Sequence, residues 1–487
     1  MIAGVDMLSI VARGVGLMVL SADDAPASAP VAATAHDATR LSIVEGYIGV
    51  LMVAFMVTLC ATPIMRRVAV AQGVIDRPNE ARKIHRIPIA YLGGVAVYLG
   101  IIGGLFYAVL GVQVPGLIDW HVSKYHELGD FFLPIPLSIV LGMTVIMMVG
   151  LIDDVTGISP RVKLGGQLFA AAGLAVDNVG VKLAAGLLMP MAKSFGIPLT
   201  MLPDNTATVM LQIPIPFEIA GAHAIPIDII YWVGTAIIAI AVLGLCNASN
   251  LVDGLDGLLS GTTAIAATGL LVVALGLAVI DDGPRDSQRI ILCLALLGAC
   301  LGFLPHNFNP ANIFLGDAGS LLLGFVTCVI ILMMGDTGKT SLVVAGLMIY
   351  AIPVIDTTLA IIRRKMEGKP ISAPDDQHLH HMLKRALGVK GAVLVLYGIA
   401  ATFAALGASI TLVRARMVYF LGLVLVSFVG VTAIKIARKR AIELQAAEYE
   451  AKRAAGLAGP AAATTAAPQV APAPAAASQP SARSTNA

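Results

Sequence analysis

Long apolar stretches recur along almost the whole chain and limit its fold more than any other feature. A helix needs roughly 17–25 apolar residues to cross the hydrocarbon core of a membrane. Eleven stretches approach or reach that length: 42–64, 91–113, 133–152, 164–180, 229–247, 258–280, 289–305, 320–335, 341–362, 391–411 and 417–436. Charged residues make up 13% of the 487 positions, about half of what a soluble domain carries. The sequence therefore predicts an all-α polytopic membrane protein with about eleven transmembrane helices.

The two ends of the chain differ from the part between them. Residues 1–41 hold a short apolar run interrupted by Arg13 and followed by Ala, Pro and Ser. We interpret them as a flexible extension, with a signal peptide as the alternative. Residues 441–487 form a tail that from about 454 is almost entirely Ala, Pro, Ser and Thr, which predicts disorder. The spanning domain is expected to cover residues 42–440.

Lysine and arginine are distributed unevenly over the predicted loops. Loops 65–90 and 363–390 hold six and seven of them, whereas the alternate loops hold one or two each. Because basic loops stay in the cytoplasm, we expect a cytoplasmic C-terminus and an external N-terminus. The longest external connection, 181–228, contains PLTMLP and LQIPIPFEI, whose alternation suggests short strands or re-entrant turns.

Charge and cysteine usage exclude several classes of function. The formal net charge is +2, and the basic residues lie in short loops without interleaved aromatic residues, which argues against nucleic acid as a partner. Five cysteines lie in or beside apolar runs and form no CxxC pair. They are expected to be packing residues, and they predict neither disulfides nor a metal site.

Five polar blocks interrupt the apolar pattern, and all of them fall in predicted cytoplasmic loops. They are DRPNEARKIHRIP (76–88), DDVTGISPRVK (153–163), NASNLVDGLDG (247–257), HNFNPANIFLGDAGS (306–320) and APDDQHLHHML (373–383). Blocks from distant parts of the chain that share one membrane face can build a single active site from helix ends. We therefore expect the active site on the cytoplasmic face.

Each block also has a simpler interpretation. Asp153 and Asp154 could be a solvated pair at a helix end, although two like charges at a membrane boundary repel each other and resist desolvation. Asp317 could be a helix N-cap, worth about 1 kcal/mol. The amides and acids of residues 247–257 are typical of a turn. Their spacing of three, however, would place four of them near one helical face: Asn247, Asn250, Asp253 and Asp256.

The histidines of HLHH make zinc an alternative metal. His380 and His381 are neighbours, so we expect them to point apart on a helix, and no HExxH-like spacing accompanies them. The blocks together offer several carboxylates, hard oxygen ligands and basic residues without thiolates. Such a set suits Mg²⁺ on a diphosphate. Composition thus favours phosphoryl-group chemistry at a membrane surface.

The same blocks resemble those of the polyprenyl-phosphate N-acetylhexosamine-1-phosphate transferases, integral membrane enzymes that begin bacterial cell-envelope polymers. The resemblance runs from about Arg66 to Gly388, two thirds of the chain. It rests on DRPNEARKIHRIPIAYLGG, GLIDDVTGISPRVKLGGQ, NASNLVDGLDGL, FLPHNFNPANIFLGDAGSLLLG and DDQHLHHMLKRALG. Any one block is a weak signal, whereas five in this order are specific.

Within the family the chain is similar to the WecA/TagO-like branch, which transfers GlcNAc-1-phosphate from UDP-GlcNAc to undecaprenyl phosphate and releases UMP. The similarity lies in DRPNEARKIHRIP before the GG pair and in DDQHLHHML. The branch that uses UDP-MurNAc-pentapeptide usually has PTMGG where this chain has IAYLGG. Another UDP-N-acetylhexosamine, or the muramyl-peptide donor, is the alternative. The resemblance implies the bacterial inner membrane, and it leaves a homodimer and the downstream polymer, lipopolysaccharide or teichoic acid, open.

The resemblance also implies roles for individual residues. The expected metal, Mg²⁺ with Mn²⁺ as a substitute, would be held by Asp317 and Asn250. Asp153 would bind or deprotonate the lipid phosphate, with Asp154 alongside. The other expected catalytic residues are Asp253 and Asp256, which would help place metal and nucleotide. The expected substrate-binding residues are Lys83, His85, Asn247, His378, His380 and His381.

Two other classes of membrane protein remain as alternatives. A secondary transporter would place its acids near the middle of helices and in both halves of the chain, whereas here they lie at predicted cytoplasmic helix ends. An intramembrane aspartyl protease would share LGDAG with this chain, but its GxGD motif requires glycine where Phe314 stands.

Overall fold

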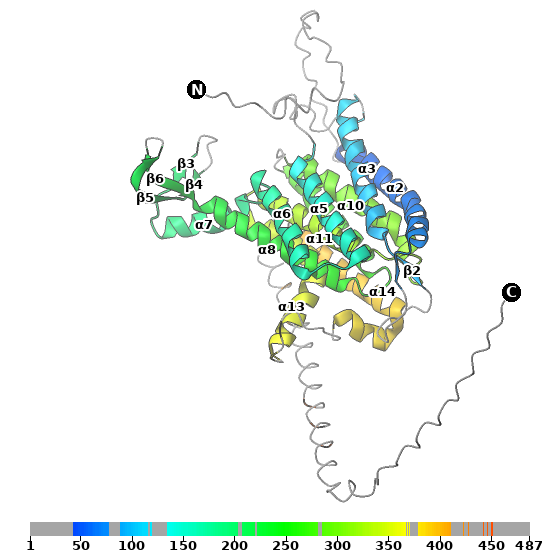
Figure 1. Ribbon diagram of the computed structural model, residues 1–487. Helices are drawn as coiled ribbons and strands as arrows, with labels where there is room; N and C mark the ends of the chain where they lie inside the picture. Colours follow the sequence, from blue (N-terminus) through cyan, green and yellow to red (C-terminus); the bar gives the residue numbers. More distant parts are fainter. Residues whose placement is uncertain are drawn as a thin grey trace, which may run out of the picture.

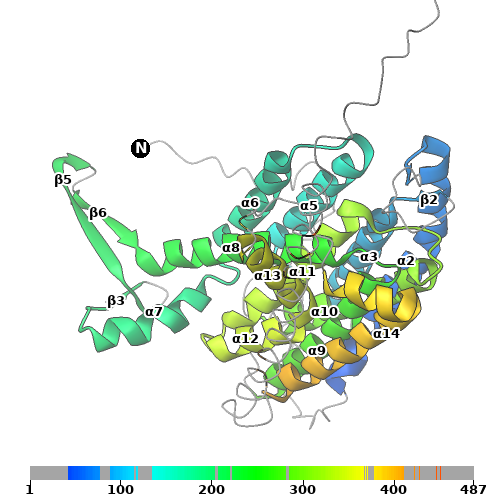
Figure 2. The same cartoon turned by 90° about the horizontal axis from the view of Figure 1, so that it is seen from below.

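The computed structural model describes most of the region between the two predicted ends. The described residues are 42–76, 88–114, 117–118, 134–202, 207–219, 222–280, 285–366, 368, 370 and 378–410, with five isolated positions beyond them. They form a bundle of long helices from which a small lobe with β-hairpins projects to one side (Figures 1 and 2). The predicted extension 1–41 and nearly all of the tail 441–487 lie outside the described residues, so their domain boundaries stay predictions.

Twelve helices lie within the described residues. They are α2 (Ser42–Gln72), α3 (Gly93–Gln113), α5 (Leu137–Thr156), α6 (Pro160–Val176), α7 (Lys182–Ser194), α8 (Ile229–Val252), α9 (Leu258–Ile280), α10 (Asp286–Asn307), α11 (Gly316–Gly335), α12 (Thr340–Ile349), α13 (Ala351–Met366) and α14 (Leu379–Ser409). The all-α architecture of the spanning part is confirmed.

Eight of the described helices are long and apolar enough to cross a membrane: α2, α3, α5, α8, α9, α10, α11 and α14. The pair α12 and α13, bent by 83°, adds a ninth if it counts as one span. The chain is therefore a multi-pass membrane protein, but the predicted number of eleven spans is not confirmed. The predicted span 164–180 falls largely on α6, a helix of 17 residues, and 417–436 is described at only two positions. The orientation across the membrane stays a prediction.

Helix α11 forms the centre of the bundle. The apolar part of α11 is completely buried, as expected for a helix that is hydrophobic on every side. It packs against α3, α5, α8, α9, α10 and α12, and both views show it within the bundle (Figures 1 and 2). Small residues permit the close contacts: a Cβ at Gly324 would lie 2.6 Å from the Leu245 carbonyl oxygen of α8.

Two of the polar blocks are joined through their backbones. Strand β1 (Ile75–Asp76) pairs antiparallel with β2 (Ile89–Ala90). The segment after β2 then bonds to the segment before α11: the Phe314 N–H donates to the Ala90 carbonyl (2.9 Å), and the Gly93 N–H donates to the Phe314 carbonyl (3.0 Å). The glycine pair is needed for this approach, because a Cβ at Gly94 would lie 2.1 Å from the Gly319 nitrogen.

The projecting lobe is built from the long connection between α6 and α8. It contains α7 and two antiparallel hairpins, β3 (Thr200–Met201) with β4 (Ala207–Thr208), and β5 (Met210–Ile219) with β6 (Ala222–Asp228). The register of the longer hairpin runs from Met210 opposite Asp228 to Pro214 opposite Ala224, with an irregularity before Ile219. The predicted short strands are confirmed, whereas α7 was not predicted.

Candidate active site

The two adjacent acids at the end of α5 contact different segments. Asp153 Oδ2 lies 2.5 Å from the Lys163 Nζ, and its Oδ1 accepts a hydrogen bond from the Ile158 N–H (2.9 Å). Asp154 instead accepts from the N–H groups of Asp317 (2.7 Å) and Ala318 (3.0 Å). Neighbouring residues on a helix point about 100° apart. One acid therefore faces Lys163, and the other closes the N-terminus of α11.

Asp154 supplies the cap that α11 lacks within its own segment. Leu315 stands at the N-cap position and offers no side-chain hydrogen bond. The first N–H groups of a helix have no partner within it and carry partial positive charge. The Asp154 carboxylate, which comes from α5, accepts hydrogen bonds from two of these N–H groups and also places negative charge beside the positive helix end. A Cβ at Gly316, where φ is 68°, would lie 2.4 Å from Asp154 Oδ2, so a side chain would not fit there.

Asp317 lies in the first turn of α11, with its carboxylate directed to other helices. Its Oδ2 accepts from Lys163 Nζ (2.5 Å), and its Oδ1 accepts from Asn250 Nδ2 (2.8 Å). The Asn250 amide also contacts Ser320 Oγ at 2.9 Å. The simple N-cap interpretation of Asp317 is therefore wrong, because Asp317 is the second residue of α11 and Asp154 caps that helix.

Lys163 joins the two acidic blocks and was missed as a site residue. Its ammonium lies 2.5 Å from an oxygen of both Asp153 and Asp317. Partial burial lowers the pKa of the lysine, but the hydrogen bonds to these two carboxylates outweigh burial and raise it above its ordinary value. Gly157 (φ 67°) turns the chain after α5, and α6 brings Lys163 back beside Asp153. The signal was the basic end of DDVTGISPRVK.

The loop between α8 and α9 is tied to the loop before α11. Asp256 Oδ2 accepts from Asn309 Nδ2 (2.8 Å) and from the Ala311 N–H (3.1 Å). Asn307 Oδ1 accepts from the Gly257 N–H at 3.1 Å. The amides of this second loop were not predicted as site residues. They hold Asp256 and Gly257, and with them this part of the loop, against the segment before α11.

Asp253, in the loop after α8, is a carboxyl group whose ionisation is disfavoured. Burial, together with repulsion from Asp317, Asp154 and Asp256, raises its pKa to about 8. A raised carboxyl pKa beside other acids is common at functional sites. Among the described residues, the arrangement therefore gathers more carboxyl groups than basic side chains.

A cavity of about 750 Å³ opens between these loops. Its volume falls within the roughly 300–1,000 Å³ of ligand pockets. The described residues lining it include four acids, one arginine and one histidine: Asp76, Asp253, Asp256, Asp317, Arg66 and His381. Four of the five polar blocks thus contribute directly to one cavity, and Asp153 and Asp154 reach it through Asp317.

The donor set suits a hard divalent cation. Asp317 and Asp253 provide carboxylate oxygens, and Asn250 has an amide oxygen in addition to the nitrogen that bonds Asp317. No cysteine lines the cavity among the described residues. The Lys163 ammonium between two carboxylates shows that positive charge is stabilised at this place. Oxygen ligands of this kind fit Mg²⁺ or Mn²⁺ and not a thiophilic metal.

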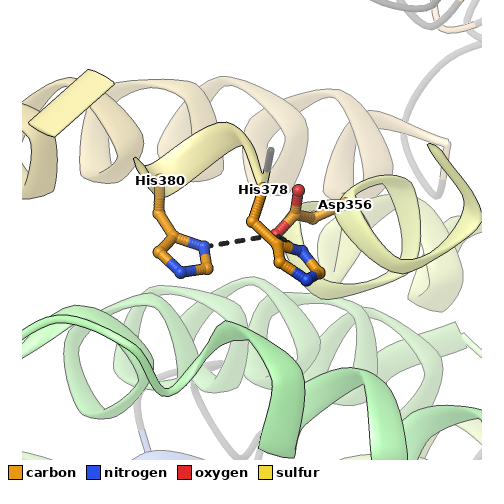
Figure 3. Close-up of side chains that lie close together, drawn as sticks. All are labelled: Asp356, His378 and His380. Atoms are coloured by element: carbon orange, nitrogen blue, oxygen red, sulfur yellow. Dashed lines mark hydrogen bonds and ion pairs between the residues drawn. The ribbon is translucent and has the colours of Figure 1, made fainter. Parts of the chain in front are cut away.

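The histidines at the beginning of α14 divide between two environments. His378 and His380 are buried against Asp356 of α13 (Figure 3). His381, in contrast, lines the cavity. The rings of His380 and His381 lie 4.3 Å apart, so the expectation that they point away from each other is wrong. At the first turn of a helix, neighbouring side chains have room to meet. The third group beside His378 and His380 is Asp356 and not His381, so the three-histidine zinc site has no support here.

Some predicted residues lie away from the cavity lining. Asn247 Nδ2 donates to Gln167 Oε1 of α6 (2.8 Å) and to the Leu243 carbonyl (2.7 Å), a contact between helices. Lys83 and His85 lie outside the described residues. Asp356 was missed, although a lone acid in the apolar run AIPVIDTTLAII is a signal of a functional or paired group.

Comparison with known proteins adds independent information. The model of glycosyl transferase family 4 matches residues 136–335. The chain is 31% identical over 356 residues to a probable undecaprenyl-phosphate N-acetylglucosaminyl 1-phosphate transferase of Bacillus subtilis, covering 71% of this chain and 81% of that protein. It is 31% identical to the decaprenyl-phosphate N-acetylglucosaminephosphotransferase of Mycobacterium tuberculosis (71% and 78% covered). It is 30% identical to the undecaprenyl-phosphate alpha-N-acetylglucosaminyl 1-phosphate transferase of Escherichia coli (70% and 77%).

Proposed function

Because the chain belongs to glycosyl transferase family 4, we propose that it transfers GlcNAc-1-phosphate from UDP-GlcNAc to undecaprenyl phosphate and releases UMP. The names of its relatives in Bacillus subtilis and Escherichia coli support both the sugar and the lipid acceptor. The reaction would be the first membrane step of a cell-envelope polysaccharide. Because the chain belongs to a family of sugar-phosphate transferases, the transporter and protease alternatives have no support.

The observation that carries this proposal is the convergence of carboxylates from separate blocks on one cavity. Acids from the ends of α5 and β1, the loop after α8 and the beginning of α11 surround or adjoin it. Two anionic substrates can meet only where their repulsion is offset, so an excess of carboxylates implies that cations bind with them. A transferase that joins two phosphates needs such a site.

The proposed reaction exchanges one diphosphate linkage for another. An oxygen of undecaprenyl phosphate forms a bond to the β-phosphorus of UDP-GlcNAc, and the bond from that phosphorus to the bridging oxygen breaks, so UMP leaves. We assign Asp153 to the lipid phosphate, which it positions or deprotonates from beside Lys163. Asp154 acts by holding the beginning of α11 and hence Asp317. His381 lies in the cavity wall, where it can contact the donor diphosphate.

The proposed cofactor is Mg²⁺, with Mn²⁺ as a substitute. Asp317 and Asn250 would hold it, and Asp253 and Asp256 would help place it with the nucleotide. Bound there, the cation would neutralise charge on the diphosphate. Lys163 adds a positive charge between Asp153 and Asp317 that belongs to the protein itself and does not depend on a bound cation.

We further propose that the enzyme lies in the bacterial inner membrane with the cavity open to the cytoplasm, where UDP-sugars are made. Basic residues in loops 65–90 and 363–390 support this orientation.

Purified full-length protein tests the function directly. It is incubated in detergent with Mg²⁺, undecaprenyl phosphate and a panel of UDP-sugars, and released UMP and the lipid product are measured. We expect UMP from UDP-GlcNAc alone, and none once EDTA is in excess. Transfer only from UDP-MurNAc-pentapeptide would overturn the donor, and full activity in EDTA would overturn the metal. Decaprenyl phosphate in a parallel assay tests the choice of acceptor.

A further inference from the structure

One buried carboxylate on α13 holds three consecutive residues at the beginning of α14. Asp356 Oδ2 lies 3.1 Å from His378 Nδ1 and 3.3 Å from His380 Nδ1, and its Oδ1 accepts from the Leu379 N–H at 2.8 Å. Figure 3 shows the two rings side by side with Asp356 behind them. All three side chains are nearly inaccessible, with 2% of Asp356, 5% of His378 and 2% of His380 exposed.

The hydrogen bonds fix which atoms of the rings are free. An ionised carboxylate only accepts hydrogen bonds, so Nδ1 of each ring carries the hydrogen. Nε2 is then the atom that each ring directs elsewhere, as in other carboxylate–histidine pairs whose carboxylate sets the tautomer and the orientation. Without Asp356 either ring could turn over or exchange its tautomer.

His380 is directed at the cavity loop. A Cβ added to Gly254 would lie 2.6 Å from His380 Nε2, so the ring lies directly against the backbone of this residue. Gly254 lines the cavity between Asp253 and Asp256. The next residue along α14, His381, lines the same cavity. The beginning of α14 therefore contacts the cavity at two places that both depend on how its first turn is held.

We propose that Asp356 is a positioning residue for the transfer reaction. Its carboxylate holds His380 against Gly254, and it thereby fixes His381 and the Asp253–Asp256 loop at the site of the donor diphosphate. The inference rests on the proposed function, since it concerns the same cavity and donor. Asp356 touches no substrate and acts entirely through the two histidines and the helix N-terminus.

The test uses Asp356→Asn, which keeps the size of the side chain. Asparagine has one oxygen and one NH₂ group, so it can still accept from the Leu379 N–H but cannot hold both rings in their present tautomer. We expect kcat/KM for UDP-GlcNAc to fall about 10- to 100-fold, the usual cost of losing a partner that orients a functional histidine. The KM for undecaprenyl phosphate should not change.

A double-mutant cycle separates positioning from mere stability. If Asp356 acts through His380, Asp356→Asn should cost less than about threefold once His380→Ala is present. Asp336→Asn is the matched control, a buried acid paired with Arg285 at the far end of α11, and its effect should multiply with that of His380→Ala. The proposal would be overturned if the effects of Asp356→Asn and His380→Ala on kcat/KM multiplied fully. It would also be overturned if Asp356→Asn alone kept activity within about twofold of wild type.

A second perturbation reaches the same contact from the other side. Gly254→Ala places a methyl group where His380 Nε2 lies, and we expect it to lower kcat/KM for UDP-GlcNAc while leaving the KM of the lipid unchanged. Loss of this effect in His380→Ala would support the proposal, and its persistence would overturn it.

Two further measurements keep the outcomes distinct. Calorimetry of UDP-GlcNAc binding to wild type, Asp356→Asn, His380→Ala and the double variant gives the same cycle without any need for turnover. If wild type releases no UMP, the proposed function is wrong, but the binding data still test the role of Asp356. Metal analysis of the purified protein is the other. Stoichiometric zinc in wild type that Asp356→Asn loses would overturn the positioning role in favour of a metal site, because these three side chains lie close enough to share an ion.

Discussion

The two ends of helix α11, roughly 30 Å apart, treat buried charge in opposite ways. Beyond its C-terminal end, Asp336 pairs with Arg285 (2.7 Å) and also accepts from the Gly180 N–H (3.0 Å). Close by, Asp286 pairs with Arg289, whose guanidinium also donates twice to the Met333 carbonyl. Among the described residues at this end, Asp336 and Asp286 each pair with one arginine, so these pairs balance in charge.

The N-terminal end of α11 has no such balance. Among the described residues, five acids gather there, and one lysine contacts two of them: Asp153, Asp154, Asp253, Asp256, Asp317 and Lys163. A balanced buried pair holds helices together at little net gain, and breaking it is costly. A cluster of acids that outnumber their basic partners beside a cavity indicates that a bound ligand or cation supplies the missing positive charge. The comparison separates charge that holds the fold from charge that serves a ligand.

The most severe test of this difference is Asp317→Asn. We expect turnover to fall by about 10³-fold or more, since losing one group that stabilises transition-state charge already costs about 10²- to 10³-fold. Thermal stability in detergent should change little, because Asp154 still caps α11. The measurement is single-turnover UMP release beside a melting curve. A loss of stability in proportion to the loss of activity would place Asp317 with the structural acids.

The acid pair of α5 sharpens the comparison within a single helix turn. Asp153→Asn should lower turnover about 10²- to 10⁴-fold, the range of a general base, while UDP-GlcNAc binding survives. Asp154→Asn should cost less activity but about 1–3 kcal/mol of stability, because its amide nitrogen cannot accept from the α11 backbone. Calorimetry and melting curves of both variants measure this. The assignment is wrong if Asp153→Asn abolishes nucleotide binding and leaves lipid binding intact.

At the other end of α11 the expected pattern reverses. Arg289→Met removes the arginine that pairs with the buried Asp286, and breaking a buried pair typically costs about 3–5 kcal/mol. Turnover per folded molecule should stay within about twofold of wild type at a temperature well below the transition. Unfolding curves and initial rates of the same preparation provide the comparison. A large fall in turnover without a fall in stability would remove the distinction between the two ends.

The smallest expected effect concerns pH. Because Asp253 has a pKa of about 8, above its ordinary value, the folded protein binds a proton that the unfolded chain has already released between about pH 4 and pH 8. The contribution of this group to stability is therefore largest below about pH 4 and declines as pH rises from about 4 to about 8. Without divalent metal, the melting temperature of wild type should fall more between pH 6 and pH 8.5 than that of Asp253→Asn. Mg²⁺ should raise the melting temperature of wild type more at pH 8.5 than at pH 6. Parallel curves for both proteins would contradict this role of Asp253.

Much of the fold follows from local sequence. Runs such as LLLGFVTCVIILMMG need no partner to be identified as membrane helices, since their length and apolarity already require burial or lipid. The strands of the projecting lobe followed from alternation in LQIPIPFEI. The number of spans did not follow from local sequence in the same way, because α6 is short and α12 and α13 meet at a sharp bend. Hydropathy averages over such a bend and cannot detect it.

The sequence by itself determined the class of protein, the polar blocks and the residue types of the site, because each depends on composition within a short segment. Only the tertiary structure decided which acid faces which partner. Asp154 meets the α11 backbone 163 residues later, Lys163 meets Asp317 154 residues later, and Asp356 holds histidines from another helix. These pairings depend on the rotation and the packing of helices that are far apart in the chain. Neighbouring side chains point about 100° apart in every α-helix, but which acid faces Lys163 and which faces the end of α11 depends on how α5 is rotated against its neighbours. Local sequence does not contain that rotation.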